Sequence, residues 1–199
     1  MKKFEVEQSG RSMIEMLGVL AIVGVLSVAG IAGYSKAMGK FKNSKVMDQV
    51  STLSANIKTQ FASMGTYTPL TGELRAFNLG LFPEDMVKTC TSESCDPTHG
   101  MNGGAKVLGG AGSFEILFMG LPKESCVSLL TSDWGGSAGF RGMDLSSTDS
   151  ITIPSSFIAG GNTCVKTVRT PSAECLSQKG NAIARDYCAD GVSVGWVFY

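Results

Sequence analysis

The chain has 199 residues, which is enough for one domain of ordinary size with an appended element. Lysine plus arginine and aspartate plus glutamate each number 17, so the formal net charge is zero; a nucleic-acid-binding protein needs a basic excess and is disfavoured. The hydrophobic fraction of 43% argues against a disordered chain. The single histidine, His99, argues against a histidine-based catalytic triad or a multi-histidine metal site.

The N-terminal part of the chain changes abruptly from polar to apolar. Residues 1–10 are short and polar and look like a processing or targeting segment. Residues 16–34 then read MLGVLAIVGVLSVAGIAGY, without a charge, which is close to the roughly 20 residues that span a bilayer as a helix. Ala29 and Gly33 have the small-xxx-small spacing that lets two helices approach closely. We predict a transmembrane segment at about 14–34, because a soluble core helix would need a polar face.

The helical pattern continues beyond the apolar run. Apolar residues recur three or four positions apart, which places them on one helical face: Met47, Val50, Leu53, Ile57, Phe61 and Met64. The sequence therefore predicts one helix over 11–64, apolar all round in its first half and amphipathic in its second. Gly65 suits the left-handed residue that ends many helices. The amphipathic half requires a globular head, residues 65–199, to pack against it.

The head has the pattern of an α+β domain. Residues 66–112 are rich in proline and glycine and are expected to be mainly loop, with a short helix after Pro83. A second helix is expected at 122–131, opened by proline with an acid in its first turn. Strands are expected at 113–119, 151–153, 164–168 and 192–199.

All six cysteines follow the apolar run, an arrangement that suits disulfides in an oxidising compartment. Six cysteines allow fifteen pairings, so the count alone does not assign them. Six free thiols in a cytosolic protein are the alternative. A metal site built from Cys90, Cys95 and His99 would have a spacing that matches no common zinc motif, and no fourth ligand is evident.

The sequence offers little for catalysis. It contains no phosphate loop, zinc-protease, serine-hydrolase or dinucleotide-binding motif. The adjacent acids Glu84 and Asp85 suit a helix start, Asp144 and Asp149 are expected in a solvated loop, and His99 in an exposed turn. We therefore predict no catalytic residue, no cofactor and no metal, and the chain is not expected to be an enzyme.

Glu15 is the most informative single residue. It lies at the beginning of the apolar run, where a carboxylate is costly to bury and usually has a partner. Arg11 is four residues earlier and could pair with it on the same helix. A position close to the membrane interface would equally keep the carboxylate hydrated.

The stretch GRSMIEML, residues 10–17, resembles the N-terminus of type IV prepilins. In that family a membrane peptidase cuts after the last leader residue and methylates the new N-terminus. The resemblance implies cleavage between Gly10 and Arg11, N-methylation of Arg11, and a role in subunit assembly for Glu15, the fifth residue after the cut.

The downstream chain resembles the type IVb branch, which includes toxin-coregulated and conjugative thin-pilus pilins. The similar segments are residues 78–87, residues 114–130 with Cys126, and Cys188 followed by 192–199. The resemblance implies a long N-terminal helix packed on an antiparallel sheet, with a disulfide-stapled C-terminal region. It implies the disulfide Cys126–Cys188; proximity in sequence suggests Cys164–Cys175 and Cys90–Cys95.

The family also implies partners and a location. We expect a homopolymer that adheres, aggregates cells, transfers DNA or drives motility. The precursor would meet prepilin peptidase and the pilus assembly machinery in the bacterial inner membrane, and the product would be an extracellular pilus. A minor pilin or a type II secretion pseudopilin is the alternative. A secreted domain whose signal peptide ends near Ser27–Ala29 is a third interpretation, which would leave Glu15 and the Gly10 spacing as coincidences.

Overall fold

The computed structural model describes residues 13–132, 134, 139–146, 163–167, 174–176 and 188–199. The chain divides into two compact units, residues 1–40 and residues 41–199. A single helix, α1 (Met13–Phe61), supplies the described part of the first unit and begins the second. It ends three residues before the predicted Met64, and Gly65 has the left-handed φ of 64° expected after a helix.

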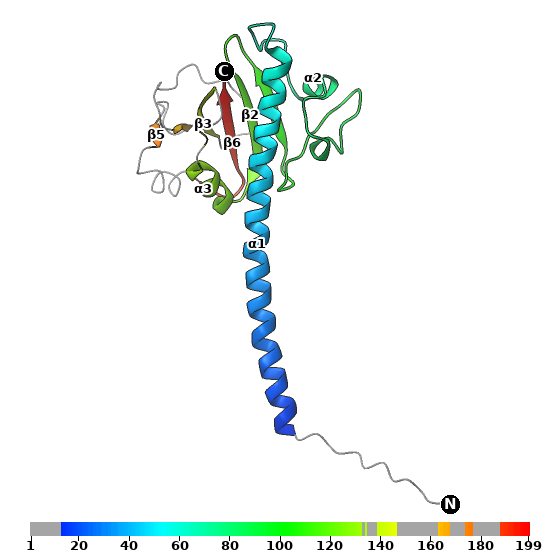
Figure 1. Cartoon of the computed structure of the whole chain (residues 1–199), viewed down its shortest axis with the longest axis vertical. Helices are drawn as coiled ribbons and strands as arrows, with labels where there is room; N and C mark the ends of the chain where they lie inside the picture. The colour runs from blue at the N-terminus through cyan, green and yellow to red at the C-terminus, as the bar shows by residue number, and fades with distance from the viewer. Residues whose placement is uncertain (1–12, 133, 135–138, 147–162, 168–173, 177–187) are drawn as a thin grey trace, which may run out of the picture. The chain divides into compact units, whose positions relative to one another are not determined.

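The second unit is built on a sheet in the order β1-β2-β6-β3-β4-β5. Its strands are β1 (Ala105–Gly109), β2 (Phe114–Leu121), β3 (Phe140–Ser146), β4 (Thr163–Thr167), β5 (Glu174–Leu176) and β6 (Val192–Phe198). The neighbours β1, β2, β6 and β3 are all antiparallel, which confirms the predicted antiparallel sheet, whereas β4 pairs parallel to β3. The C-terminal strand β6 therefore lies inside the sheet, between β2 and β3 (Figure 1).

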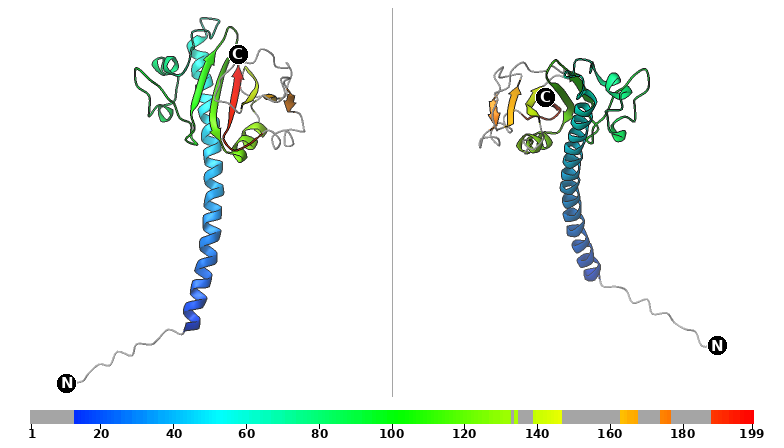
Figure 2. Two further views of the ribbon diagram at one scale, coloured as in Figure 1. Left: turned by 180° about the vertical axis from the view of Figure 1, so that it is seen from behind. Right: turned by 45° about the horizontal axis from the view of Figure 1, so that its top comes forward.

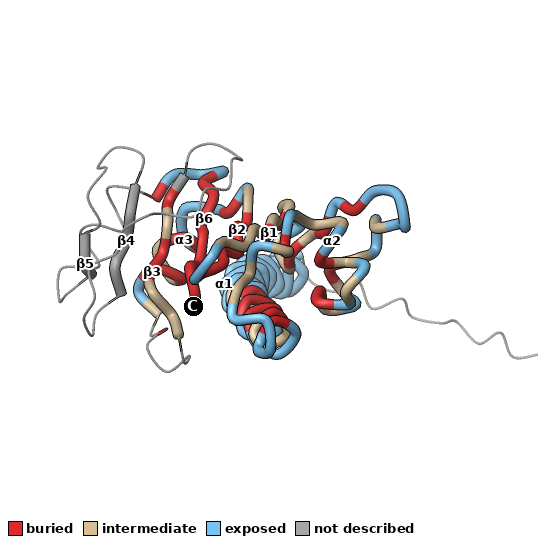
Figure 3. Tube along the Cα trace, turned by 90° about the horizontal axis from the view of Figure 1, so that it is seen from above, coloured by how far each residue is buried: buried red, intermediate tan, exposed pale blue. Residues whose placement is uncertain are grey.

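Within the second unit, α1 packs on one face of this sheet, as Figure 1 and the view from behind in Figure 2 show. The helix contributes the predicted apolar face, of which Val50, Leu53 and Ile57 are fully buried. The sheet contributes alternate residues of its inner strands, including Ile116 on β2 and Trp196 on β6. Figure 3 shows these buried stretches of α1, β2 and β6 next to one another. The core is thus formed by long-range contacts between both ends of the chain.

Three shorter helical elements complete the head: α2 (Glu73–Asn78), the 3-10 helix η1 (Glu84–Met86) and α3 (Lys123–Thr131). The last two occur where the sequence predicts helix, and Glu84 and Asp85 lie in the first turn of η1 as expected. Residues 66–112 are rich in loops as expected, but α2 and β1 within them were not predicted, and neither was β3. Asp144, expected in a solvated loop, is a half-buried residue of β3. The predicted strand 151–153 and Asp149 lie outside the described residues.

Candidate functional site

The first described residues of α1 form an apolar rod. Every residue from Met13 to Ala37 is exposed in the single chain, including bulky side chains such as Ile14, Leu20 and Val25. An 18-residue window of this helix has a mean hydropathy of 2.3 and no buried residue, so it is long and apolar enough to cross a membrane. Ser27 donates its hydroxyl to the Val23 carbonyl at 2.8 Å, so the helix itself satisfies this polar group. Such a surface requires lipid or other apolar helices as its environment.

Glu15 lies in the first turn of α1, as the sequence pattern requires. The positive end of the helix dipole favours an acid at this position. The carboxylate makes no ion pair with any residue in the described ranges, and its side chain is exposed. Gly10 and Arg11 lie outside the described residues, so the cleavage site, the methylation site and the Arg11–Glu15 pair stay predictions.

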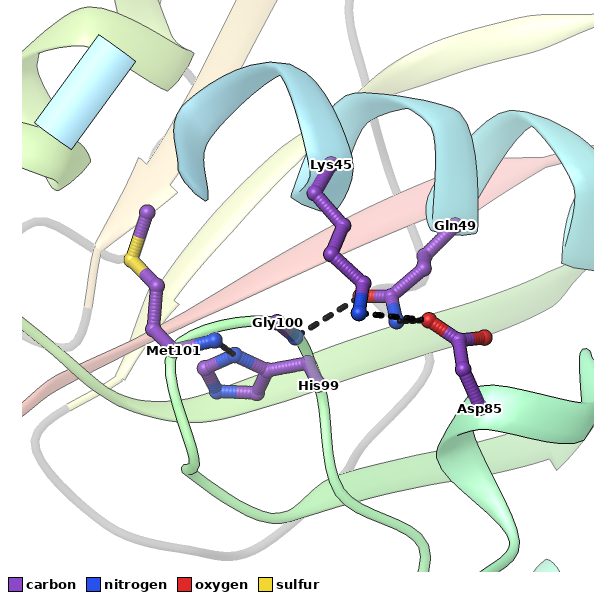
Figure 4. A network of polar contacts seen from close by, with 6 residues as sticks. All are labelled: Lys45, Gln49, Asp85, His99, Gly100 and Met101. Atoms are coloured by element: carbon purple, nitrogen blue, oxygen red, sulfur yellow. Dashed lines mark hydrogen bonds and ion pairs between the residues drawn. The ribbon is translucent and has the colours of Figure 1, made fainter. Parts of the chain in front are cut away.

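In the head, a polar network joins α1 to the segment that precedes β1 (Figure 4). The Lys45 Nζ atom lies 2.9 Å from Asp85 Oδ2, and Gln49 Nε2 donates to the same oxygen at 2.8 Å. Gln49 Oε1 accepts the Gly100 N–H at 2.8 Å. Gln49 is buried, and both the nitrogen and the oxygen of its side-chain amide are hydrogen-bonded, as buried polar groups usually are. This one side chain of α1 therefore holds η1 and the loop before β1 together.

The electrostatics of this network favour an ionised Asp85. Partial burial raises the pKa of its carboxyl, but hydrogen bonds from Lys45 and Gln49 and the charge of Lys45 lower it by more, so the pKa lies below its ordinary value of 3.8. The Lys45 and Asp85 side chains are about equally accessible, at 39% and 37% exposed, so solvent screens the pair. The network positions the loop rather than contributing much stability through charge.

The expectation that His99 is an exposed turn residue is wrong. Its side chain is 2% exposed, and its ring stacks on Phe118 of β2 with centroids 4.9 Å apart. Nδ1 accepts the Met101 N–H at 3.2 Å, so the proton is on Nε2, which donates to the Met119 carbonyl at 2.8 Å. Burial lowers the pKa of His99 below 6.5, and the hydrogen bond to Met119 opposes this only in part.

Two disulfides close parts of the head. Cys126 on α3 is bonded to Cys188, just before β6, with Cα atoms 5.8 Å apart; this is the pair that the family resemblance implies. Cys90 is bonded to Cys95, as sequence proximity suggests, with Cα atoms 4.0 Å apart, so neither sulfur is a metal ligand. Cys164 and Cys175 lie opposite each other where β4 pairs with β5, but their side chains are outside the described residues.

No family model matches the chain. The sequence is similar to a curated protein, the major structural subunit of the bundle-forming pilus of Escherichia coli O111:H-. The two are 26% identical over 152 residues, which cover 76% of this chain and 77% of the relative. This similarity, the apolar helix and the GRSMIEML stretch support the same family resemblance.

Proposed function

We propose that this chain, which resembles the type IV pilins and most of all their type IVb branch, is a structural subunit of a type IV pilus. The observation that carries the proposal is the combination of an exposed, apolar first half of α1 with a head that has its own core. A fibre of such subunits would bury the apolar helices against one another and display the heads. The similarity to a pilus subunit supports a structural rather than an enzymatic role.

The proposed path begins in the inner membrane. The precursor has a leader of residues 1–10 and a span at about 14–34, with the head, residues 65–199, on the outer side. Prepilin peptidase would cut between Gly10 and Arg11 and methylate Arg11. The inner-membrane assembly machinery would then extract the subunit into an extracellular homopolymer.

The cut has a physical consequence for Glu15. It creates a positive amine at Arg11, which a packed bundle of apolar helices would bring near Glu15 of a neighbouring copy. Both groups are poorly hydrated in such a bundle and are costly unless paired, so the correct axial register is favoured over slipped ones. An intramolecular Arg11–Glu15 pair competes with this contact.

Electron microscopy of cells with and without this chain tests the proposal. Cells that lack it should lose a class of surface fibre, and complementation should restore fibres that contain the chain as their main component. A trace amount of the chain in otherwise normal fibres would favour the minor pilin, and short periplasmic assemblies would favour the pseudopilin. Intact mass of the fibre subunit should correspond to Arg11–Tyr199; a start at Gly30 would support the secreted-domain interpretation.

A further inference from the structure

The loop that leads into β1, residues 97–105, is held by several backbone hydrogen bonds. Asn102 donates its N–H to the His99 carbonyl at 2.9 Å, closing a turn in which Asn102 has a φ of 65°. His99 and Gly103 are joined by a backbone bond of 2.9 Å, and Ala105 donates to Pro97 at 2.8 Å. The 97–105 loop is therefore a small hairpin that leads directly into the edge strand.

His99 connects this loop to β2. Its Nε2–H donates to the Met119 carbonyl, while the Met119 N–H donates back to the Gly104 carbonyl at 2.9 Å. Its Nδ1 accepts the Met101 N–H from within the same turn. Both ring nitrogens thus have a partner: the Met119 carbonyl requires a proton on Nε2, and the Met101 N–H requires that Nδ1 carries none.

A second proton would break this arrangement. It would sit on Nδ1 and point at the Met101 N–H, so two donors would face each other in a buried site. Met101 would have to turn away. The neighbouring Gly100 N–H, which donates to Gln49 of α1, belongs to the same turn, so this contact with α1 is coupled to the position of Met101.

The charged groups near the loop do not offset the cost of a second proton on His99. From α1, the Lys45 chain lies against Gly100, where an added Cβ would be 3.0 Å from its Cγ and Cδ, and its charge opposes a second cation. From η1, Asp85 is engaged by Lys45 and Gln49. On β1, Lys106 lies on the opposite face from Ala105 and its partner Phe118, on which the His99 ring stacks. β2 contributes the Phe118 ring and the Met119 carbonyl, neither of which titrates.

We propose that His99 is a pH-sensitive latch, which holds the 97–105 loop against α1 and β2 only while its imidazole is neutral. The proposal is independent of the pilus role. Because the ring is harder to protonate in the closed loop than in an open one, closure is fully favoured above pH 6.5 and is lost as the pH falls below it. In the open form, the imidazole should bind one proton with its ordinary affinity. The equilibrium constant for opening should then rise between pH 7 and pH 5, by up to about 25-fold.

The test uses the full chain in detergent, where His99 is the only histidine and gives one imidazole signal. Nitrogen NMR should find the Nε2–H tautomer at pH 7 and a titration midpoint below 6.5. Hydrogen exchange, corrected for intrinsic rates, should show that amides of the 97–105 loop, and the Met119 amide that is bonded to it, lose protection between pH 7 and 5, while those of β6 and of the rest of β2 do not. A midpoint at or above 6.5, or the Nδ1–H tautomer, would overturn the proposal.

Two variants separate the latch from other titrating groups. His99→Gln cannot take up a proton, so protection of the loop should no longer change between pH 7 and 5, whatever its absolute level. Asp85→Asn removes the nearby carboxylate and, whatever its absolute level of protection, should keep the wild-type pH response. The same pH response in His99→Gln as in the wild type, or its loss in Asp85→Asn alone, would contradict a role for the imidazole.

Discussion

At the scale of single residues, the packing around His99 leaves no room for a larger residue at Gly103. A Cβ added there would overlap the Met119 carbonyl and the His99 Nε2 atom. This part of β2 is tied to the turn itself, because the Met119 N–H donates to the Gly104 carbonyl and the Met119 carbonyl accepts from His99. We expect Gly103→Ala to destabilise the head by about 1–3 kcal/mol, as overpacking does elsewhere.

Chemical denaturation of the purified chain measures this effect. Gly112→Ala is the matched control, because a Cβ at Gly112 would meet no atom within 4 Å. Its free energy of unfolding should stay within about 0.5 kcal/mol of the wild type. Equal stabilities for the two variants would mean that the His99 turn is looser than its contacts indicate.

At the scale of elements, β1 is the edge of the sheet, yet its outward N–H groups are covered. Ala105 donates to the Pro97 carbonyl and Gly109 to the Leu70 carbonyl, both at 2.8 Å. Between them, Val107 donates to Glu73 Oε1 of α2 at 3.4 Å. The segment between α1 and β1 therefore protects an edge that could otherwise pair with another chain.

Removing the Glu73 carboxylate tests this protection. Glu73→Ala leaves the N–H of the fully buried Val107 without its acceptor and should cost about 1 kcal/mol of stability. Glu73→Gln keeps an acceptor oxygen and should lie closer to the wild type. Glu93→Ala, an exposed acid elsewhere in the same segment, should have no effect in the same denaturation experiment. A loss in Glu93→Ala as large as in Glu73→Ala would argue against the edge contact.

The disulfides differ in the loops that they close. Cys126 and Cys188 are 62 positions apart and tie α3 to the beginning of β6, so loop entropy predicts that removing both sulfurs costs about 4 kcal/mol. Cys90 and Cys95 are five positions apart, and the same relation predicts about 2 kcal/mol for them. Denaturation of the Cys126→Ala/Cys188→Ala and Cys90→Ala/Cys95→Ala double variants should preserve this order, and the reverse order would contradict the loop argument.

These elements show which parts of the fold a sequence can predict. The core face of α1 follows from spacing alone, because a helix repeats every few residues and Val50, Leu53 and Ile57 are each one turn apart. The strand β1 and the helix α2 are only five and six residues long, and their stability comes from each other and from β2. The burial of His99 depends on Met119, twenty positions away, and its turn is held by Gln49, fifty-one positions before Gly100. Patterns among neighbouring residues in the sequence do not predict such long-range contacts.

At the scale of the whole molecule, the two units differ in what surrounds their apolar side chains. Among the described residues, no member of the hydrophobic core precedes Val46, whereas the apolar side chains from Met13 to Ile31 are exposed. A chain that starts near Tyr34 should therefore keep the core and both described disulfides. We expect it to be a folded, soluble monomer by sedimentation and circular dichroism, and to form no fibres. An unfolded product would show that the head depends on the apolar segment.

Glu15 should act in assembly and not in folding, because its side chain is exposed and the hydrophobic core of the described residues begins only at Val46. Glu15→Ala should therefore leave a chain that is held in the membrane, is disulfide-bonded and resists protease as the wild type does. Electron micrographs should show no fibres built from it. The loss follows from the amine of the neighbouring subunit, which would be buried without a partner once the carboxylate is gone.

Glu15→Asp keeps the charge at a shorter reach and should retain part of the fibre yield. Ser12→Ala removes a polar group nearby without touching the charge and should assemble normally. Normal fibres from Glu15→Ala would instead favour the pair with Arg11 on the same helix, and the intersubunit role would have to be abandoned.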